Sequence, residues 1–98
     1  MSWYVLNDLK EAVPSDVTSF QPADKRRVAR TELAGGAVEI STVFLGLDHS
    51  YGQGPPILFE TMVFGGLLDE ECERYSTWIE AEQGHEAMVD RVRATLDS

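Results

Sequence analysis

The sequence contains a single cysteine, Cys72, in 98 residues. One cysteine cannot form a disulfide within the chain, so a secreted fold stabilised by internal disulfides is excluded and a reducing cytosol is the expected location. No apolar run approaches the roughly 20 residues that span a bilayer, and residues 1–14 lack the basic and long apolar segments of a secretory leader. We therefore expect neither secretion nor insertion into a membrane.

Basic residues are also scarce. Eight lysines and arginines stand against 17 acids, which gives a formal net charge of −9. This charge repels phosphate backbones, so direct nucleic-acid binding is not expected. The acids concentrate after Leu68, in the C-terminal third of the chain. The small basic cluster formed by Lys25, Arg26, Arg27 and Arg30 suits an acidic partner, including a second copy, although most such clusters are only solvated.

What the chain has is enough apolar material for one core. Hydrophobic residues make up 43% of the sequence, and neither an internal repeat nor a linker divides it. A chain of this length rarely supports two cores, so we expect a single domain over residues 1–98.

Three segments have the β-branched, aromatic and alternating composition of strands. Arg27–Leu33 alternates weakly, and Ala34–Gly36 supplies the positive-φ residues that a hairpin turn needs. Residues 37–47 predict a central strand, and residues 57–64 predict a second one that ends at two glycines. The short run Trp3–Leu6 is compatible with an edge strand. One face of the predicted central strand carries Val38, Ile40, Thr42 and Phe44.

The clearest helix signal opens at Thr77, which forms a capping box with Glu80. The helix is expected to run to about Leu96. Together with the strands, this predicts an α+β fold, a small antiparallel sheet of three or four strands with a C-terminal helix packed on one face. The apolar stripe of the helix is predicted at Ala81, His85, Met88, Val89, Val92 and Leu96.

In three stretches the chain resembles a family of small uncharacterised proteins of bacteria, phages and prophages. The stretches are residues 41–49 (STVFLGLDH), residues 55–66 (PPILFETMVFGG) and residues 74–85, which follow the pattern RYSTWxEAxxGH. The resemblance covers about half of the chain. It implies a phage or prophage accessory protein made in the host cytoplasm, and it supplies no catalytic residue and no cofactor.

Four ionisable residues stand where a simple fold does not require them. Asp48 and His49 follow a strand, Glu60 has apolar neighbours on its face of a strand, and His85 lies in the apolar stripe of the helix. One hypothesis is that they converge as metal ligands or as an acid and base pair. The alternative is that Glu60 and His85 satisfy each other or the backbone, and that Asp48 caps the following loop.

Arg74 and Tyr75 lie just before the predicted helix. Free amides at a helix N-terminus favour an anion, so Arg74 is a candidate to hold a phosphate or carboxylate there. The competing interpretation is a structural ion pair of Arg74 with Glu71, Glu73 or Glu60.

Three functions remain open on these residues. The first is a non-enzymatic accessory protein that binds a host protein or small ligand, for example as an inhibitor of host defence or transcription. The second is a small metal-assisted hydrolase centred on Glu60 and His85. The third is a structural subunit of a homo-oligomer, assembled through an exposed strand edge such as Trp3–Leu6.

Overall fold

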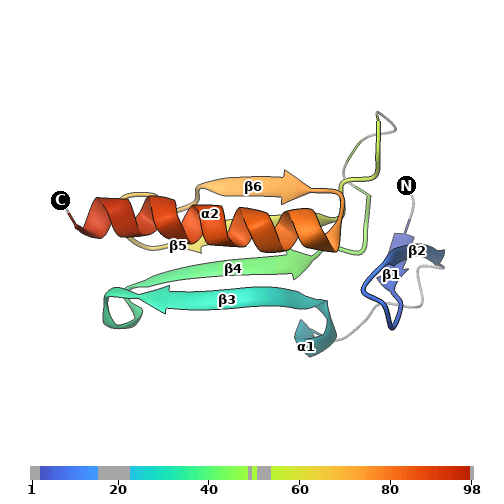
Figure 1. The fold of residues 1–98 in the computed structure, drawn as a ribbon, viewed down its shortest axis with the longest axis horizontal. Coiled ribbons are helices and arrows are strands. Elements are labelled where there is room, and N and C mark those ends of the chain that lie inside the picture. The colour runs from blue at the N-terminus through green and yellow to red at the C-terminus, as the bar shows by residue number, and fades with distance from the viewer. Residues whose placement is uncertain (1–2, 16–22, 49, 51–53, 98) are drawn as a thin grey trace.

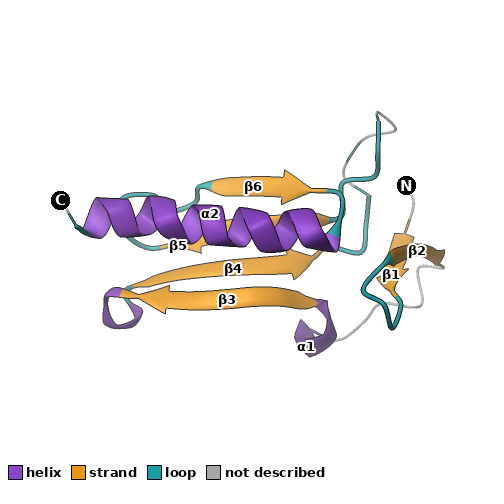
Figure 2. Cartoon of the chain, in the orientation of Figure 1, coloured by secondary structure: helices purple, strands orange, loops and turns teal. Residues whose placement is uncertain are grey.

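The computed structural model describes residues 3–15, 23–48, 50 and 54–97. Its main body is a four-stranded antiparallel sheet in the order β3-β4-β5-β6, with the helix α2 lying along one face (Figures 1 and 2). A separate two-stranded sheet, β1-β2, stands at one end. The elements are β1 (Trp3–Leu6), β2 (Ala12–Ser15), α1 (Ala23–Arg26), β3 (Arg27–Leu33), the short 3-10 turn η2 (Ala34–Gly36), β4 (Val38–Phe44), β5 (Phe59–Phe64), β6 (Cys72–Tyr75) and α2 (Trp78–Leu96).

This arrangement confirms the predicted fold class. The molecule is elongated, with extents of 45 × 27 × 20 Å, and its N-terminal and C-terminal ends lie at opposite ends of the long axis (Figure 1). Within the described residues, no helix has both the length and the apolar composition needed to cross a membrane.

Alternation along β4 decides which side of the sheet the helix covers. Every second residue is buried, from Val38 to Phe44, and the residues between them are only partly covered. The same alternation in β5 buries Phe59, Thr61 and Val63. Because successive side chains of a strand point to opposite faces, the buried set faces α2 and the other set forms an open face with no described element over it.

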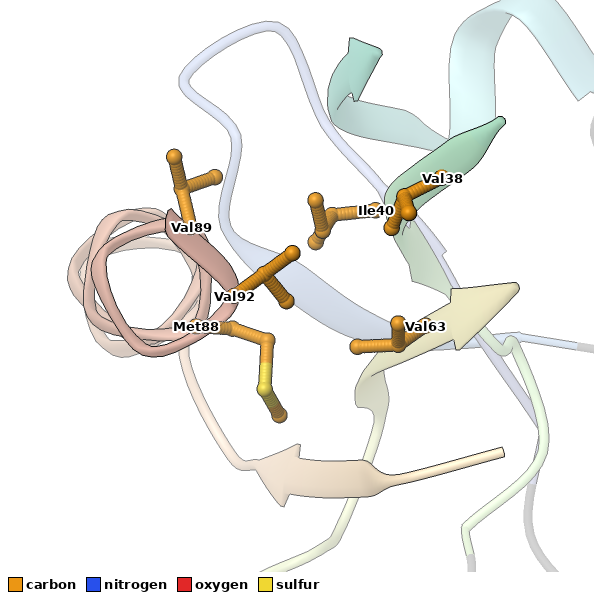
Figure 3. Packing of buried hydrophobic residues seen from close by; sticks show 6 residues of the cluster. All are labelled: Val38, Ile40, Val63, Met88, Val89 and Val92. Carbon is orange, nitrogen blue, oxygen red and sulfur yellow. The ribbon is translucent and has the colours of Figure 1, made fainter. Parts of the chain in front are cut away.

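The core has two parts. Close to the C-terminal half of α2, Met88 and Val92 point from the helix toward side chains of the sheet (Figure 3). At the other end, the β1-β2 hairpin packs onto the sheet and onto the first turns of α2. The first cluster consists of Val38, Ile40, Val63, Met88, Val89 and Val92, and the second of Leu6, Phe44, Leu58, Phe59 and Ala81.

The predicted central elements formed close to their expected bounds. The strand predicted over residues 37–47 ends at Phe44, because Gly46 adopts a φ of 83° and its carbonyl accepts a hydrogen bond from the Tyr4 amide. The strand predicted over residues 57–64 begins at Phe59. The capping box of Thr77 and Glu80 is present. The prediction that Leu96 lies in the buried stripe is wrong, because this residue is 44% exposed at the last turn of α2.

The ends of the fold were predicted less well. Trp3–Leu6 is a strand, but it pairs with β2 in a hairpin, and Pro14 lies within β2 opposite Tyr4. Neither β2, α1 nor β6 was predicted. β6 consists of Cys72, Glu73, Arg74 and Tyr75, none of which is fully buried, so it lacks the apolar alternation that reveals a strand.

Candidate functional site

His85 lies at the centre of the interface between α2 and the sheet. Its side chain is only 1% exposed, yet both ring nitrogens have partners. Nε2 lies 2.8 Å from the Thr31 hydroxyl of β3, and Nδ1 lies 2.7 Å from the Thr42 hydroxyl of β4. A buried imidazole with both nitrogens bonded does not carry the penalty of an unsatisfied polar group.

The hydrogen bonds continue across the sheet. The hydroxyls of Thr42 and Thr61 lie 2.5 Å apart on neighbouring strands, and the Tyr75 hydroxyl donates to Thr61 at 3.2 Å. A polar chain therefore runs from Tyr75 at one edge of the sheet to Thr31 at the other, passing beneath α2. We call it the threonine-histidine network; its members are Thr31, Thr42, Thr61, Tyr75 and His85.

The direction in which the Tyr75 hydroxyl donates assigns one tautomer to His85. Because Tyr75 donates to Thr61, the Thr61 proton has an acceptor within the network only if it is donated to Thr42. Thr42 then donates to Nδ1, which places the ring proton on Nε2, where it is donated to Thr31. The opposite direction, in which Thr61 donates to the Tyr75 oxygen, would place the ring proton on Nδ1.

Burial shifts the pKa of the two titratable members of this network, His85 and Tyr75. Desolvation disfavours the charged imidazole and lowers the pKa of His85 below the usual 6.5, while nearby Glu86 opposes this to a smaller extent. Desolvation likewise raises the pKa of Tyr75 above the usual 10.0, against the effect of its hydrogen bond to Thr61. Near neutral pH both side chains are therefore uncharged.

Glu60 and His85 do not meet, so the part of either hypothesis that brought their side chains together is wrong. Glu60 lies on the open face of the sheet, opposite α2, where its carboxylate accepts a hydrogen bond from Arg74 Nε at 2.9 Å. Its side chain is 16% exposed, so it forms a half-buried ion pair. Alternation explains the error, because Thr61 and not Glu60 faces the helix. In this structure Glu60 and His85 therefore lie on opposite faces of the sheet and do not form one site.

Arg74 takes the structural role that the sequence offered as the alternative to anion binding. It lies directly across from Glu60 in the β5-β6 ladder. The first turn of α2 is already occupied by the carboxylate of Glu80, which accepts from the amides of Ser76 and Thr77 at 3.3 and 3.1 Å. This negative charge disfavours a second anion at the same amides.

Asp48 caps the loop that follows β4, as the alternative to a metal or acid-base site predicted. Its carboxylate accepts hydrogen bonds from the Ser50 amide and hydroxyl and from the Ile57 amide, at 2.8 to 2.9 Å. These bonds leave Asp48 holding the two ends of the loop together. His49 lies outside the described residues. Across the part of the chain that is described, no group of three or more histidine, cysteine or acidic side chains is arranged to hold a metal ion.

A cavity that the sequence did not reveal lies between the β1-β2 hairpin and the start of α2. Its volume is about 410 Å³, within the range typical of ligand and side-chain pockets. Two large apolar residues at its mouth are strongly exposed, Leu9 at 77% and Ile79 at 65%. The large apolar and aromatic residues of its lining are Tyr4, Leu9, Leu58, Phe59, Trp78 and Ile79.

The polar residues that line this cavity, which we call the Trp78 pocket, are Lys10, Glu11, Ser76 and Thr77. The Lys10 ammonium lies 5.1 Å from the centre of the Trp78 ring, in a cation-π contact, and Glu11 lies beside it in the lining. The pocket escaped the sequence analysis because its two sides are nearly 70 residues apart along the chain. In the sequence, the only indication of the pocket was that Leu9 and Ile79 are large apolar residues outside the predicted core.

An acidic line on the outer face of α2 begins near this pocket. Glu82, Glu86 and Asp90 follow one another at the i, i+4 spacing that places side chains on one face of a helix, and all three are exposed. Within the described residues, none of them forms an ion pair. The line therefore presents unneutralised negative charge.

Comparison with known proteins adds no relative. No protein family, curated protein or solved structure matches the chain.

Proposed function

We propose that this chain is a non-enzymatic accessory protein, of the phage or prophage type that the resemblance implies, which acts in the bacterial cytoplasm by binding a host protein. The observation that carries the proposal is the Trp78 pocket. It is an apolar cavity of about 410 Å³ whose mouth exposes Leu9 and Ile79. Exposed large apolar residues around a concave apolar site are typical of a surface that a partner covers.

The chemistry around the pocket indicates what the partner carries. An apolar side chain fits the cavity, and the flat Trp78 ring provides the contact area that dominates many protein interfaces. Next to it, the acidic line of Glu82, Glu86 and Asp90 favours a basic surface and speeds its approach. A host protein of defence or transcription, with a basic nucleic-acid-binding surface and an apolar anchor, fits both features.

The buried polar residues favour binding over catalysis. His85 is enclosed by Thr31 and Thr42, Asp48 holds its loop, and Glu60 is paired with Arg74. Each of these candidate catalytic groups already has structural partners. The Trp78 pocket, in contrast, has an open apolar mouth.

The test is a capture experiment from bacterial lysate at low salt, with a matched pair of variants. Ile79→Glu places a charge at the pocket mouth, whereas Leu67→Glu places the same charge at an 82% exposed leucine in the turn between β5 and β6. That turn lies at the opposite end of the molecule (Figure 1). We expect wild type and Leu67→Glu to retain the same host protein, and Ile79→Glu to lose it.

The retained protein should also elute as salt rises, because its basic surface faces the acidic line. Equal retention by both variants would show that the pocket is not the binding site. Failure of the wild type to retain any protein at low salt would overturn the proposal.

A further inference from the structure

The outer edge of β3 is unpaired within the described part of the chain. β3 is the first strand of the sheet, hydrogen-bonded to β4 on one side only, and Figure 1 shows no described element along its other side. An edge strand exposes a row of backbone donors and acceptors that can pair with another strand. Which residues expose them follows from the bonds of the neighbouring strands.

The hydrogen bonds of β5 show which of its residues direct their backbone groups toward β6 and which toward β4. The Val63 amide donates to the Glu71 carbonyl at 3.0 Å, and the Val63 carbonyl accepts from the Glu70 amide at 2.8 Å. Val63 therefore bonds toward β6. Because alternate residues of a strand bond to opposite neighbours, Met62 bonds toward β4, where its partner is Ser41.

The same alternation of backbone hydrogen bonds can be followed through β4 to the outer edge of β3. Since Ser41 bonds toward β5, its neighbour Ile40 bonds toward β3, where its partner is Thr31. Thr31 thus directs its backbone groups inward. The residues on either side of it, Arg30 and Glu32, direct their amides and carbonyls outward, to the unpaired edge.

The side chains of these two residues lie on the open face with an unbalanced charge. Glu32 is directly opposite Glu39 in the β3-β4 ladder, which is unfavourable for two carboxylates. Arg30 forms an ion pair with both carboxylates, with its Nη2 2.5 Å from Glu32 and 2.6 Å from Glu39. One guanidinium is thus shared by two acids.

We propose that two copies of this chain associate through their β3 edges, antiparallel, about a two-fold axis at Thr31. This register sets Arg30 opposite the partner's Glu32, and Glu32 opposite the partner's Arg30. All four residues direct backbone groups outward, so each such pair forms two backbone hydrogen bonds. Each Glu32 gains a second guanidinium, and two four-stranded sheets become one continuous sheet.

The registers nearest to this one fail on charge or on hydrogen bonding. An axis at Arg30 sets arginine against arginine, and an axis at Glu32 sets glutamate against glutamate. A slip by one residue sets outward-directed groups against inward-directed ones, so the backbone bonds are lost. On the helix side, the chosen register places Ala29 opposite the partner's Leu33 and Thr31 opposite the partner's Thr31. Neither pair brings a charge next to another charge or next to an apolar side chain.

The register predicts a reciprocal charge-swap experiment, measured by sedimentation as a function of concentration. Arg30→Glu and Glu32→Arg each set like charges across the axis at two symmetric positions, and we expect each to weaken association by about tenfold. The double variant Arg30→Glu with Glu32→Arg restores opposite charges in the same register. It also keeps the net charge of the chain, so we expect it to restore association to within about threefold of wild type.

Amide hydrogen exchange of the unaltered protein gives an independent readout. The amides of Arg30 and Glu32 should become protected as concentration rises, whereas the amide of Cys72, directed outward at the β6 edge by the same alternation, should not. A protein that stays monomeric at millimolar concentration would overturn the proposal. So would association in which the amides of Arg30 and Glu32 stay unprotected, or a double variant that associates no better than the single ones.

Discussion

His85 joins the helix directly to β3 and β4, and through Thr42 to β5. Its Nδ1 lies 2.7 Å from the Thr42 hydroxyl and its Nε2 lies 2.8 Å from the Thr31 hydroxyl, and burial of the ring favours its neutral form. The partners of the ring in the sheet are threonines; Glu73, which lies on the helix side of β6, is exposed and lies 3.9 Å from Arg91, and Glu86 is exposed on α2 itself. A proton added to this imidazole is therefore poorly compensated.

This gives a pH dependence of known sign. Because the folded pKa of His85 is lowered, the unfolded chain binds more protons below its own pKa of about 6.5. The contribution of the neutral ring is fully present above about pH 6.5 and is lost as pH falls toward the folded pKa. We expect the free energy of unfolding, measured with urea, to decrease from about pH 7.5 to about pH 5.5.

The matched variant for this prediction is His85→Gln, which keeps one donor and one acceptor but does not titrate. The slope of unfolding free energy against pH should be smaller in the variant than in wild type. Subtracting the two slopes also removes the contributions of the titratable groups that the two proteins share. Parallel slopes would contradict the assignment of the buried neutral imidazole.

The sequence predicted that His85 is buried but not what surrounds it. Its place in the apolar stripe follows from helical spacing alone. Its partners do not, because Thr31, Thr42 and Thr61 have the composition of ordinary strand residues. They meet the ring only through the register of three strands and the position of α2 across them. Glu60 was a candidate because it is a polar residue among apolar ones, but it lies on the open face of the sheet, and its neighbour Thr61 lies on the face that α2 covers.

The contact between α2 and β6 depends on a glycine within the helix. Gly84 lies against the Tyr75 ring, and a Cβ at this position would overlap the ring and its hydroxyl. The same hydroxyl donates to Thr61. A glycine in the interior of a helix costs about 1 kcal/mol relative to alanine. At Gly84 this cost is offset by the close packing of Tyr75 against the helix.

Gly84→Ala tests that account in two backgrounds. In wild type, we expect a net loss of about 1 to 2 kcal/mol, because crowding of Tyr75 and loss of its hydrogen bond exceed the gain in helix propensity. In the Tyr75→Ala background the ring is absent, so the same change should stabilise the protein by about 1 kcal/mol. Chemical unfolding of the four proteins completes the cycle. The same sign in both backgrounds would show that Tyr75 does not set the requirement for glycine.

Local signals sufficed for some elements and failed for others. The η2 turn was predicted from Gly35 and Gly36, and α2 from its capping box, because each depends on residues close together in sequence. β6 depends on pairing with β5 and has no apolar pattern of its own. The β1-β2 hairpin is held by long-range contacts, such as that of Tyr4 with Gly46, which no local pattern encodes.

At the scale of the whole molecule, the net charge of −9 acts against the compact state. Its clearest local expression is the pair Glu86 and Asp90, which are four residues apart on α2 and have no ion pair within the described residues. Like charges at this spacing destabilise a helix by a few tenths of a kcal/mol.

Neutralising that pair should therefore stabilise the protein in a salt-dependent way. We expect Glu86→Gln with Asp90→Asn to gain about 0.5 kcal/mol in about 10 mM salt, and to lose the gain in about 1 M salt, where the Debye length is about 3 Å. Glu71→Gln is the control, because it removes an acid that is paired with Arg91 at 3.1 Å and should bring no gain. Thermal unfolding at both salt concentrations measures the difference. A gain that persists in high salt would point to a cause other than charge repulsion.

The separation of the two chain ends along the 45 Å axis matters for how the protein is handled on a solid support (Figure 1). Tyr4 of β1 lines the Trp78 pocket, so an affinity tag fused ahead of β1 attaches the support beside the pocket mouth. A tag fused after α2 attaches it at the far end and leaves the pocket facing the solution. Beads or sensor chips loaded through the N-terminus should therefore under-report binding at this site, and the difference between the two orientations is itself a measure of where a captured protein sits.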